Sequence, residues 1–102
     1  MRHFLLIYRT ASDYLERRGA YRSAHLALAW NFQERRGLVL AGALAEPADG
    51  ALLLFEGESA DAAYAFANSD PYVLNGLIES WEVREWNTVV GDLAVNPLRA
   101  TD

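Results

Sequence analysis

The feature that most constrains this chain is that its strand-like segments carry bulky apolar residues on both faces. Residues 3–9 read His-Phe-Leu-Leu-Ile-Tyr-Arg, with large apolar side chains at both odd and even positions. Because successive side chains of a strand point to opposite faces, neither face of this segment suits water. Residues 51–55 read Ala-Leu-Leu-Leu-Phe, a pattern typical of a strand that is buried on both sides. The sequence therefore predicts a sheet that is covered on both faces.

Six segments follow one another in the order strand, helix, strand, strand, helix, strand. Residues 45–50 are turn-forming in composition, so the two middle strands are expected to form a hairpin. This order, in a chain of 102 residues, predicts one α+β domain of ferredoxin-like βαββαβ type, with an antiparallel sheet. The predicted strands are 3–9, 38–44, 51–55 and 77–90, and the predicted helices occupy 12–36 and 59–67.

The boundaries of the first helix follow from local signals. A helical pattern starts at Ser12, but Gly19 is expected to interrupt it, so the long helix is expected to begin near Gly19. Arg35 and Arg36 followed by Gly37 predict its end. Leu26 and Trp30 project from the side opposite the apolar stripe, which is an unusual place for a tryptophan on a surface helix.

A ferredoxin-like sheet has helices from its own chain on one face only. Since the strands are apolar on both faces, a second copy of the chain is expected to cover the open face, giving a homodimer. We expect the domain to comprise residues 1–91. Residues 92–102 contain few large apolar side chains and are expected to form a C-terminal tail that is flexible or contacts the partner.

Composition limits the chemistry. Because the chain has no Cys, it has no disulfide, no cysteine nucleophile and no metal site with thiolate ligands. Because it has no Lys, it has no Schiff-base lysine and no P-loop nucleotide site. Its only histidines are His3 and His25. Proton transfer by His and carboxylates remains, and we expect neither a cofactor nor a metal site.

Charge and hydropathy constrain the partners. The net charge is −5, although residues 1–36 hold seven Arg against three acids. An acidic domain without a basic stripe is not expected to bind nucleic acid. No apolar run approaches the ~20 residues that span a bilayer, and no signal peptide is recognisable, so we expect no membrane association and a cytoplasmic location.

His25 and Asp70 are the candidate catalytic residues. His25 lies on the apolar stripe of the first helix, where it is either a semi-buried structural histidine or a general acid–base. Asp70 precedes Pro71 at the end of the second helix and is either a turn residue or the carboxylate that orients His25. The serines lack a nucleophile-elbow motif, which disfavours a Ser-His-Asp hydrolase.

Several short motifs, taken in order, resemble the YCII (YciI-like) family over residues 3–91. They are Phe4-Leu5-Leu6-Ile7-Tyr8, Arg22-x-x-His25-Leu26, Gly37 with Ala41-Gly42-Ala43-Leu44, Asp70-Pro71-Tyr72 with Gly76-Leu77, and Val83-Arg84-Glu85-Trp86 with Val89-Val90-Gly91. Two departures bear on backbone shape, since the family often has Pro at the positions of Ala43 and Glu85.

The resemblance implies a ferredoxin-like fold of the dimeric α+β barrel group and a His/Asp site, which here would be His25 and Asp70. We expect a small-molecule substrate and lyase- or isomerase-type proton transfer. Arg22 is expected to pair with an anionic substrate group, and Tyr72 and Trp86 to line the pocket. The alternative is a non-catalytic ligand-binding or accessory module, which a long His25–Asp70 distance or the lack of a cavity would favour.

Overall fold

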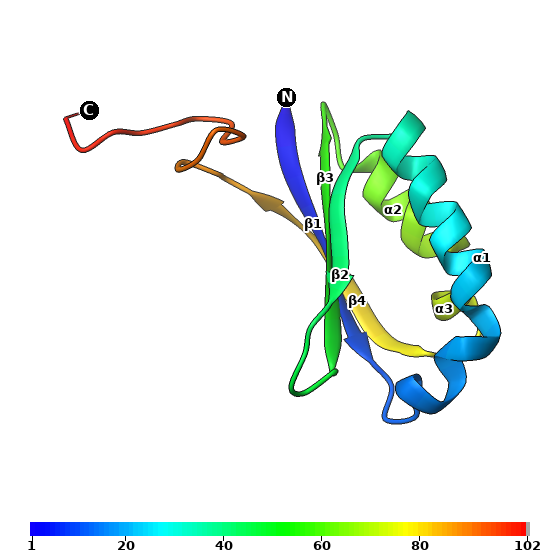
Figure 1. The fold of residues 1–102 in the computed structure, drawn as a ribbon. Coiled ribbons are helices and arrows are strands. Elements are labelled where there is room, and N and C mark those ends of the chain that lie inside the picture. Colours follow the sequence, from blue (N-terminus) through cyan, green and yellow to red (C-terminus); the bar gives the residue numbers. More distant parts are fainter. Residues whose placement is uncertain (102) are drawn as a thin grey trace.

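Four antiparallel strands form one sheet in the order β2-β3-β1-β4, and all helices lie on one face of it (Figure 1). This computed structural model describes residues 1–101. The elements are β1 (Arg2–Thr10), α1 (Tyr14–Arg35), β2 (Leu38–Ala43), β3 (Gly50–Gly57), α2 (Asp61–Ser69), α3 (Pro71–Leu74) and β4 (Ile78–Trp86). The predicted ferredoxin-like α+β fold with an antiparallel sheet is confirmed. Within the described residues, no helix is long and apolar enough to cross a bilayer.

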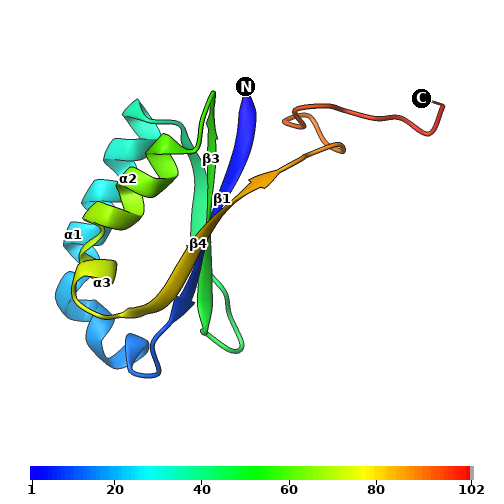
Figure 2. The same ribbon diagram turned by 180° about the vertical axis from the view of Figure 1, so that it is seen from behind.

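The register of the central strands separates a core face from an open face. Phe4 pairs with Phe55 and Leu6 with Leu53, and all four side chains are buried beneath the helices. The alternate residues of these strands point to the other face of the sheet, which none of the helices within residues 1–101 covers (Figure 2).

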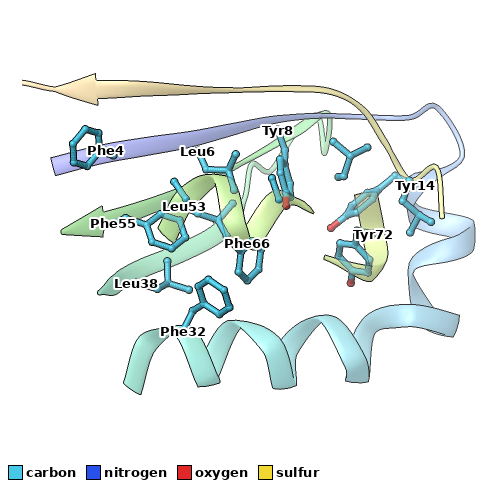
Figure 3. Packing of buried hydrophobic residues seen from close by; sticks show 14 residues of the cluster. Phe4, Leu6, Tyr8, Tyr14, Phe32, Leu38, Leu53, Phe55, Phe66 and Tyr72 are labelled. Carbon is cyan, nitrogen blue, oxygen red and sulfur yellow. The ribbon is translucent and has the colours of Figure 1, made fainter. Parts of the chain in front are cut away.

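Phe66 of α2 joins the helix layer to the sheet. It is fully buried, and its ring meets that of Phe32 in α1 edge-on, with centroids 5.2 Å apart (Figure 3). On the sheet side it packs against Phe55, at a centroid distance of 6.1 Å. Since edge-on aromatic pairs add to the stability gained from burial, these three rings fix the spacing between the helices and the sheet.

Helix α1 is longer at its N-terminus than the sequence predicts. It begins at Tyr14 and continues through Gly19, so the expected interruption at Gly19 is wrong. The reason is tertiary: Tyr14 is buried, and its ring packs edge-on against Tyr72 of α3 at 5.7 Å, which stabilises the first turn. The predicted end is confirmed, because the helix stops at Arg35 and Gly37 follows with φ +79°.

Strand β4 is shorter than predicted, ending at Trp86 rather than at Val90. Trp86 pairs with His3 near the start of β1, so no neighbouring strand remains for residues 87–90. The chain then leaves the sheet as an arm that extends away from the body (Figures 1 and 2). The Thr88 hydroxyl is hydrogen-bonded to His3 Nδ1 at 2.8 Å and accepts the Val95 N–H, which fixes the base of the arm. Asp102, the last residue of the predicted tail, lies outside the described residues.

Two glycines provide a matched test of these helix boundaries. A Cβ on Gly37 would collide with the Glu56 carbonyl oxygen, and its φ is left-handed, whereas nothing lies near a Cβ on Gly19. We expect Gly37→Ala to lower the free energy of unfolding by more than about 2 kcal/mol. Gly19→Ala should raise it by about 0.5–1 kcal/mol, since alanine favours a helix interior. Urea denaturation followed by circular dichroism measures both, and equal effects would contradict this description of α1 and its end.

Candidate active site

Asp70 lies at the junction between α2 and α3. Pro71 follows it and disfavours helical geometry at the preceding residue, so Asp70 is extended, with φ −68° and ψ 121°. The Asp70 side chain therefore turns back and accepts the backbone N–H of Tyr72 at 3.0 Å, capping α3. Although it is an acid, Asp70 is fully buried.

Three donors surround the buried carboxylate. The Tyr8 hydroxyl of β1 donates to Oδ2 at 2.7 Å, and His25 Nδ1 of α1 lies 2.8 Å from Oδ1, which also accepts the Tyr72 N–H. A buried carboxylate is costly unless hydrogen bonds replace its hydration, and here both oxygens are satisfied. One side chain thus caps the turn at Pro71 and lies within hydrogen-bond distance of His25.

The His25 ring is held on both sides. It stacks on the Tyr72 ring at a centroid distance of 3.9 Å and an angle of 8°, and the Phe66 ring meets it edge-on at 6.0 Å. Because a carboxylate oxygen can only accept, Nδ1 carries the proton, and in the neutral ring Nε2 has a free lone pair. Among residues 1–101, Nε2 has no hydrogen-bond partner, and His25 lines a cavity.

This cavity has a volume of about 570 Å³ and lies between α1 and the strands β1, β2 and β3. Such a volume suits a small organic ligand. The positions of Leu26 and Trp30, unusual for a surface helix, follow from the cavity, because both side chains line it. The lining residues are Tyr8, Thr10, Tyr14, Arg18, Arg22, His25, Leu26, Ala29, Trp30, Gln33, Leu38, Val39, Leu40, Ala41, Gly42, Ala43, Ala51, Leu53, Tyr72 and Ile78.

The two tyrosines beside Asp70 stay protonated at neutral pH. Burial, then the charge of Asp70 and the hydrogen bond to it, raise the pKa of Tyr8 well above its usual value. Burial and the neighbouring Tyr14 and Asp70 also raise the pKa of Tyr72, although Arg22 and Arg18 oppose the shift. Tyr8 therefore keeps the proton that it donates to Asp70, and the Tyr72 hydroxyl remains available as a hydrogen-bond donor.

The structure brings most of the predicted site residues together. Arg22, His25 and Tyr72 line the cavity, and Asp70 lies directly behind His25. Trp86 is not among them: its neighbour in register is His3, so it lies on the open face of the sheet and is half-exposed. Within residues 1–101, no group of three or more His, Asp or Glu side chains is arranged to hold a metal ion.

Sequence reasoning missed Tyr8, Arg18 and Trp30. Tyr8 alternates with apolar residues in a strand, and nothing in its pattern distinguishes its hydroxyl from that of a core tyrosine. Arg18 was hidden because Gly19 was expected to interrupt the helix. For Trp30 a signal existed, since its position opposite the apolar stripe of the helix indicated a second contact surface.

The Tyr8–Asp70 hydrogen bond has a measurable consequence for stability. Unfolded tyrosine ionises near pH ~10, so at higher pH the unfolded chain loses a proton that the native Tyr8 keeps, and the free energy of unfolding falls. Tyr8→Phe should lower stability by about 1–2 kcal/mol at neutral pH, since it removes a donor from the carboxylate, and should weaken the alkaline loss. Tyr64→Phe, at an exposed tyrosine, is the control. If the free energy of unfolding fell equally with rising pH in wild type and in Tyr8→Phe, the role of this bond would be contradicted.

Comparison with known proteins places the chain in a family. The family profile described as the YCII-related domain matches residues 1–87, whereas none of the curated proteins matches the chain. Among solved structures, the 5-chloro-2-hydroxyhydroquinone dehydrochlorinase of Burkholderia phenoliruptrix, in complex with 2,5-dihydroxybenzoquinone, is similar, with a TM-score of 0.70 and 23% identity. The alignment covers 84% of this chain and 94% of that one.

Two structures from Agrobacterium tumefaciens share the fold at lower similarity. A NIPSNAP family protein has a TM-score of 0.54 and 18% identity, over 95% of this chain and 97% of the other. A second protein from this organism has a TM-score of 0.57 and 14% identity, over 93% and 98% of the two chains. At these identities the likeness concerns the fold alone, which is the ferredoxin-like α+β fold. Because the family profile spans residues 1–87 of the 102, the chain belongs to the YCII-related family.

Proposed function

We propose that this protein is an enzyme in which His25 acts as general acid–base on a small organic substrate and Asp70 orients it. The observation that carries the proposal is the 2.8 Å contact between His25 Nδ1 and a fully buried Asp70 carboxylate, at the wall of a cavity of about 570 Å³. A purely structural histidine needs no buried carboxylate behind it and no unpartnered nitrogen at a cavity. The combination favours catalysis over packing.

The proposed chemistry is proton transfer without a cofactor. The Nε2 lone pair takes a proton from a carbon or hydroxyl of the substrate, and the electrons of the broken bond form a double bond. In an elimination the leaving group departs with its bonding electrons; in an isomerisation Nε2 returns the proton to another atom. The charge of Asp70 stabilises the imidazolium that forms between these steps, as in other His–carboxylate pairs.

Arg22 and Tyr72 are the proposed binding residues among those predicted from the sequence. Both line the cavity, Arg22 to pair with an anionic group and Tyr72 as a wall that also supports the His25 ring. The similar dehydrochlorinase, crystallised with 2,5-dihydroxybenzoquinone, supports a site for a small ring compound. A cytoplasmic location and the lack of a nucleic-acid partner stay predictions of the sequence.

Substitution of His25 tests the catalytic proposal. Against a panel of halogenated and oxygenated ring acids, we expect wild type to convert at least one, and His25→Asn to lower kcat by about 10²–10⁴-fold because it cannot accept the proton. Ser23→Ala, an exposed neighbour on α1, should retain full activity. Turnover is followed by the ultraviolet spectrum of the product, and folding is checked by circular dichroism.

Two results would reject the catalytic proposal. Undiminished kcat in His25→Asn would remove His25 from the chemistry. Tight binding of panel compounds by wild type, without conversion of any, would favour the non-catalytic ligand-binding or accessory module. Both results are read on folded protein, so neither depends on the stability of a variant.

We further propose that a second copy of the chain covers the open face of the sheet, forming a homodimer. Leu40 and Leu52 lie on this face with 73% and 40% of their surface exposed, and the half-exposed Trp86 lies on the same face at the end of β4. The arm also presents exposed Val90, Leu93 and Leu98. An apolar face of this kind on a sheet is typical of an interface, and we propose that Trp86 and the arm contact the partner rather than the substrate.

The dimer is tested by placing a charge on the open face. Wild type should sediment at micromolar concentration with twice the 11.4 kDa mass of one chain, and Leu52→Glu should sediment as a single chain because its carboxylate would be buried in the interface. Leu15→Glu, at an exposed leucine of the helix layer, should stay dimeric. A monomeric wild type, or a dimeric Leu52→Glu, would contradict the proposed interface.

A further inference from the structure

Two arginines of α1 face the candidate cavity one helical turn apart. Arg18 and Arg22 both line it, and His25 follows Arg22 by three residues on the same helix. Residues three and four apart lie on one helix face, so the two guanidinium groups and the imidazole approach a ligand from the same side. Both arginines act electrostatically on the Tyr72 hydroxyl, which also places their charge at the cavity wall.

Neither arginine is paired with an acid. Among residues 1–101, neither Arg18 nor Arg22 has a hydrogen bond or ion pair, and Arg18 lies over the Tyr14 ring, at 5.6 Å from the guanidinium carbon to the centroid. Two other arginines, by contrast, are paired: Arg2 binds Glu85 through two nitrogens, and Arg17 lies near Asp13 and donates to the Asn75 carbonyl. Other exposed arginines of the described residues are unpaired as well, and what distinguishes Arg18 and Arg22 is that they line the cavity.

The cavity is positively charged although the chain as a whole is acidic. No Asp or Glu is among its lining residues, and the closest acid of the site, Asp70, is buried behind His25 with both oxygens occupied. The net charge of the chain is −5. Two like charges four residues apart on a helix repel each other, so the pair gains stability when an anion lies between its members.

We infer that the cavity binds a small ring compound bearing an oxyanion, held by Arg18 and Arg22 while its reacting atom lies beside His25. The oxyanion is a carboxylate or a phosphate, since guanidinium groups bind both through paired N–H donors. The ring fits the apolar and aromatic part of the wall, including Leu26, Trp30 and Tyr72. This inference rests on the proposed function for the place of the reacting atom and for the pairing of Arg22 with an anion, and it adds Arg18 as a binding residue.

Matched ligands that differ in charge test the inference. Benzoate and phenyl phosphate are titrated against the neutral benzamide, and binding is followed by the fluorescence of Trp30 at the cavity wall, with Trp30→Phe identifying its signal. We expect at least one of the two anions to bind about tenfold or more tightly than benzamide, and whichever binds more tightly identifies the oxyanion. Affinity for the anion should fall with added salt, and that for benzamide should not.

Charge-removing variants locate the effect. Arg18→Gln and Arg22→Gln should each weaken anion binding about tenfold, and the double variant should bind the anions and benzamide alike. Arg35→Gln removes the same charge from the same helix outside the cavity and should bind as wild type does. Measuring binding to His25→Asn separates this inference from the catalytic proposal. Retained anion preference in that variant supports the arginine site whether or not wild type is catalytic.

Three results would overturn the inference. They are equal affinities of wild type for the anions and benzamide, no binding of any of the three ligands, and an equal loss of anion affinity in Arg35→Gln, which would indicate a general effect of net charge. Turnover of neutral ring compounds by wild type, without any anion preference, would reject the arginine site while leaving the role of His25 in place.

Discussion

The arrangement of this domain depends on one buried negative charge. The Asp70 carboxylate is out of contact with water and keeps its charge at acceptable cost only while its donors stay in place. Those donors come from β1, α1 and α3, so the carboxylate fixes the sheet, the long helix and the short helical turn relative to one another. Because Pro71 disfavours helical geometry at the preceding residue, Asp70 is extended, and its side chain points inward to these donors.

The continuous helix α1 connects the packing of the domain to its site. Because Tyr14 is buried in the core, the helix begins before Arg18 and continues without a break. Arg18, Arg22 and His25 therefore lie on one wall of the cavity. The cations and the imidazole are thus carried on one rigid element rather than on loops. Rigid placement of this kind reduces the conformational entropy lost when a ligand binds.

The strand pattern and the order of elements were sufficient to predict the fold, because alternation and turn composition are local properties of the chain. The sequence showed His25 on the apolar stripe of a helix and Asp70 before a proline. The 2.8 Å distance between Nδ1 of His25 and Oδ1 of Asp70 depends on tertiary packing, which no local pattern encodes. Two errors had the same origin. The low helix propensity of Gly19 predicted an interruption, but the packing of the buried Tyr14 stabilises the helix there. The end of β4 depends on where its partner strand β1 begins.

The stacking of His25 on Tyr72 has a stereochemical consequence. With one ring face covered at 3.9 Å and Nδ1 hydrogen-bonded to Asp70, the imidazole cannot tilt out of its plane without losing the stack, and cannot turn over without losing the hydrogen bond. The lone pair of Nε2 therefore keeps a single direction. An enzyme built on this histidine would distinguish the two hydrogens of a substrate methylene group, removing the same one at every turnover and adding a proton to only one face of a planar intermediate.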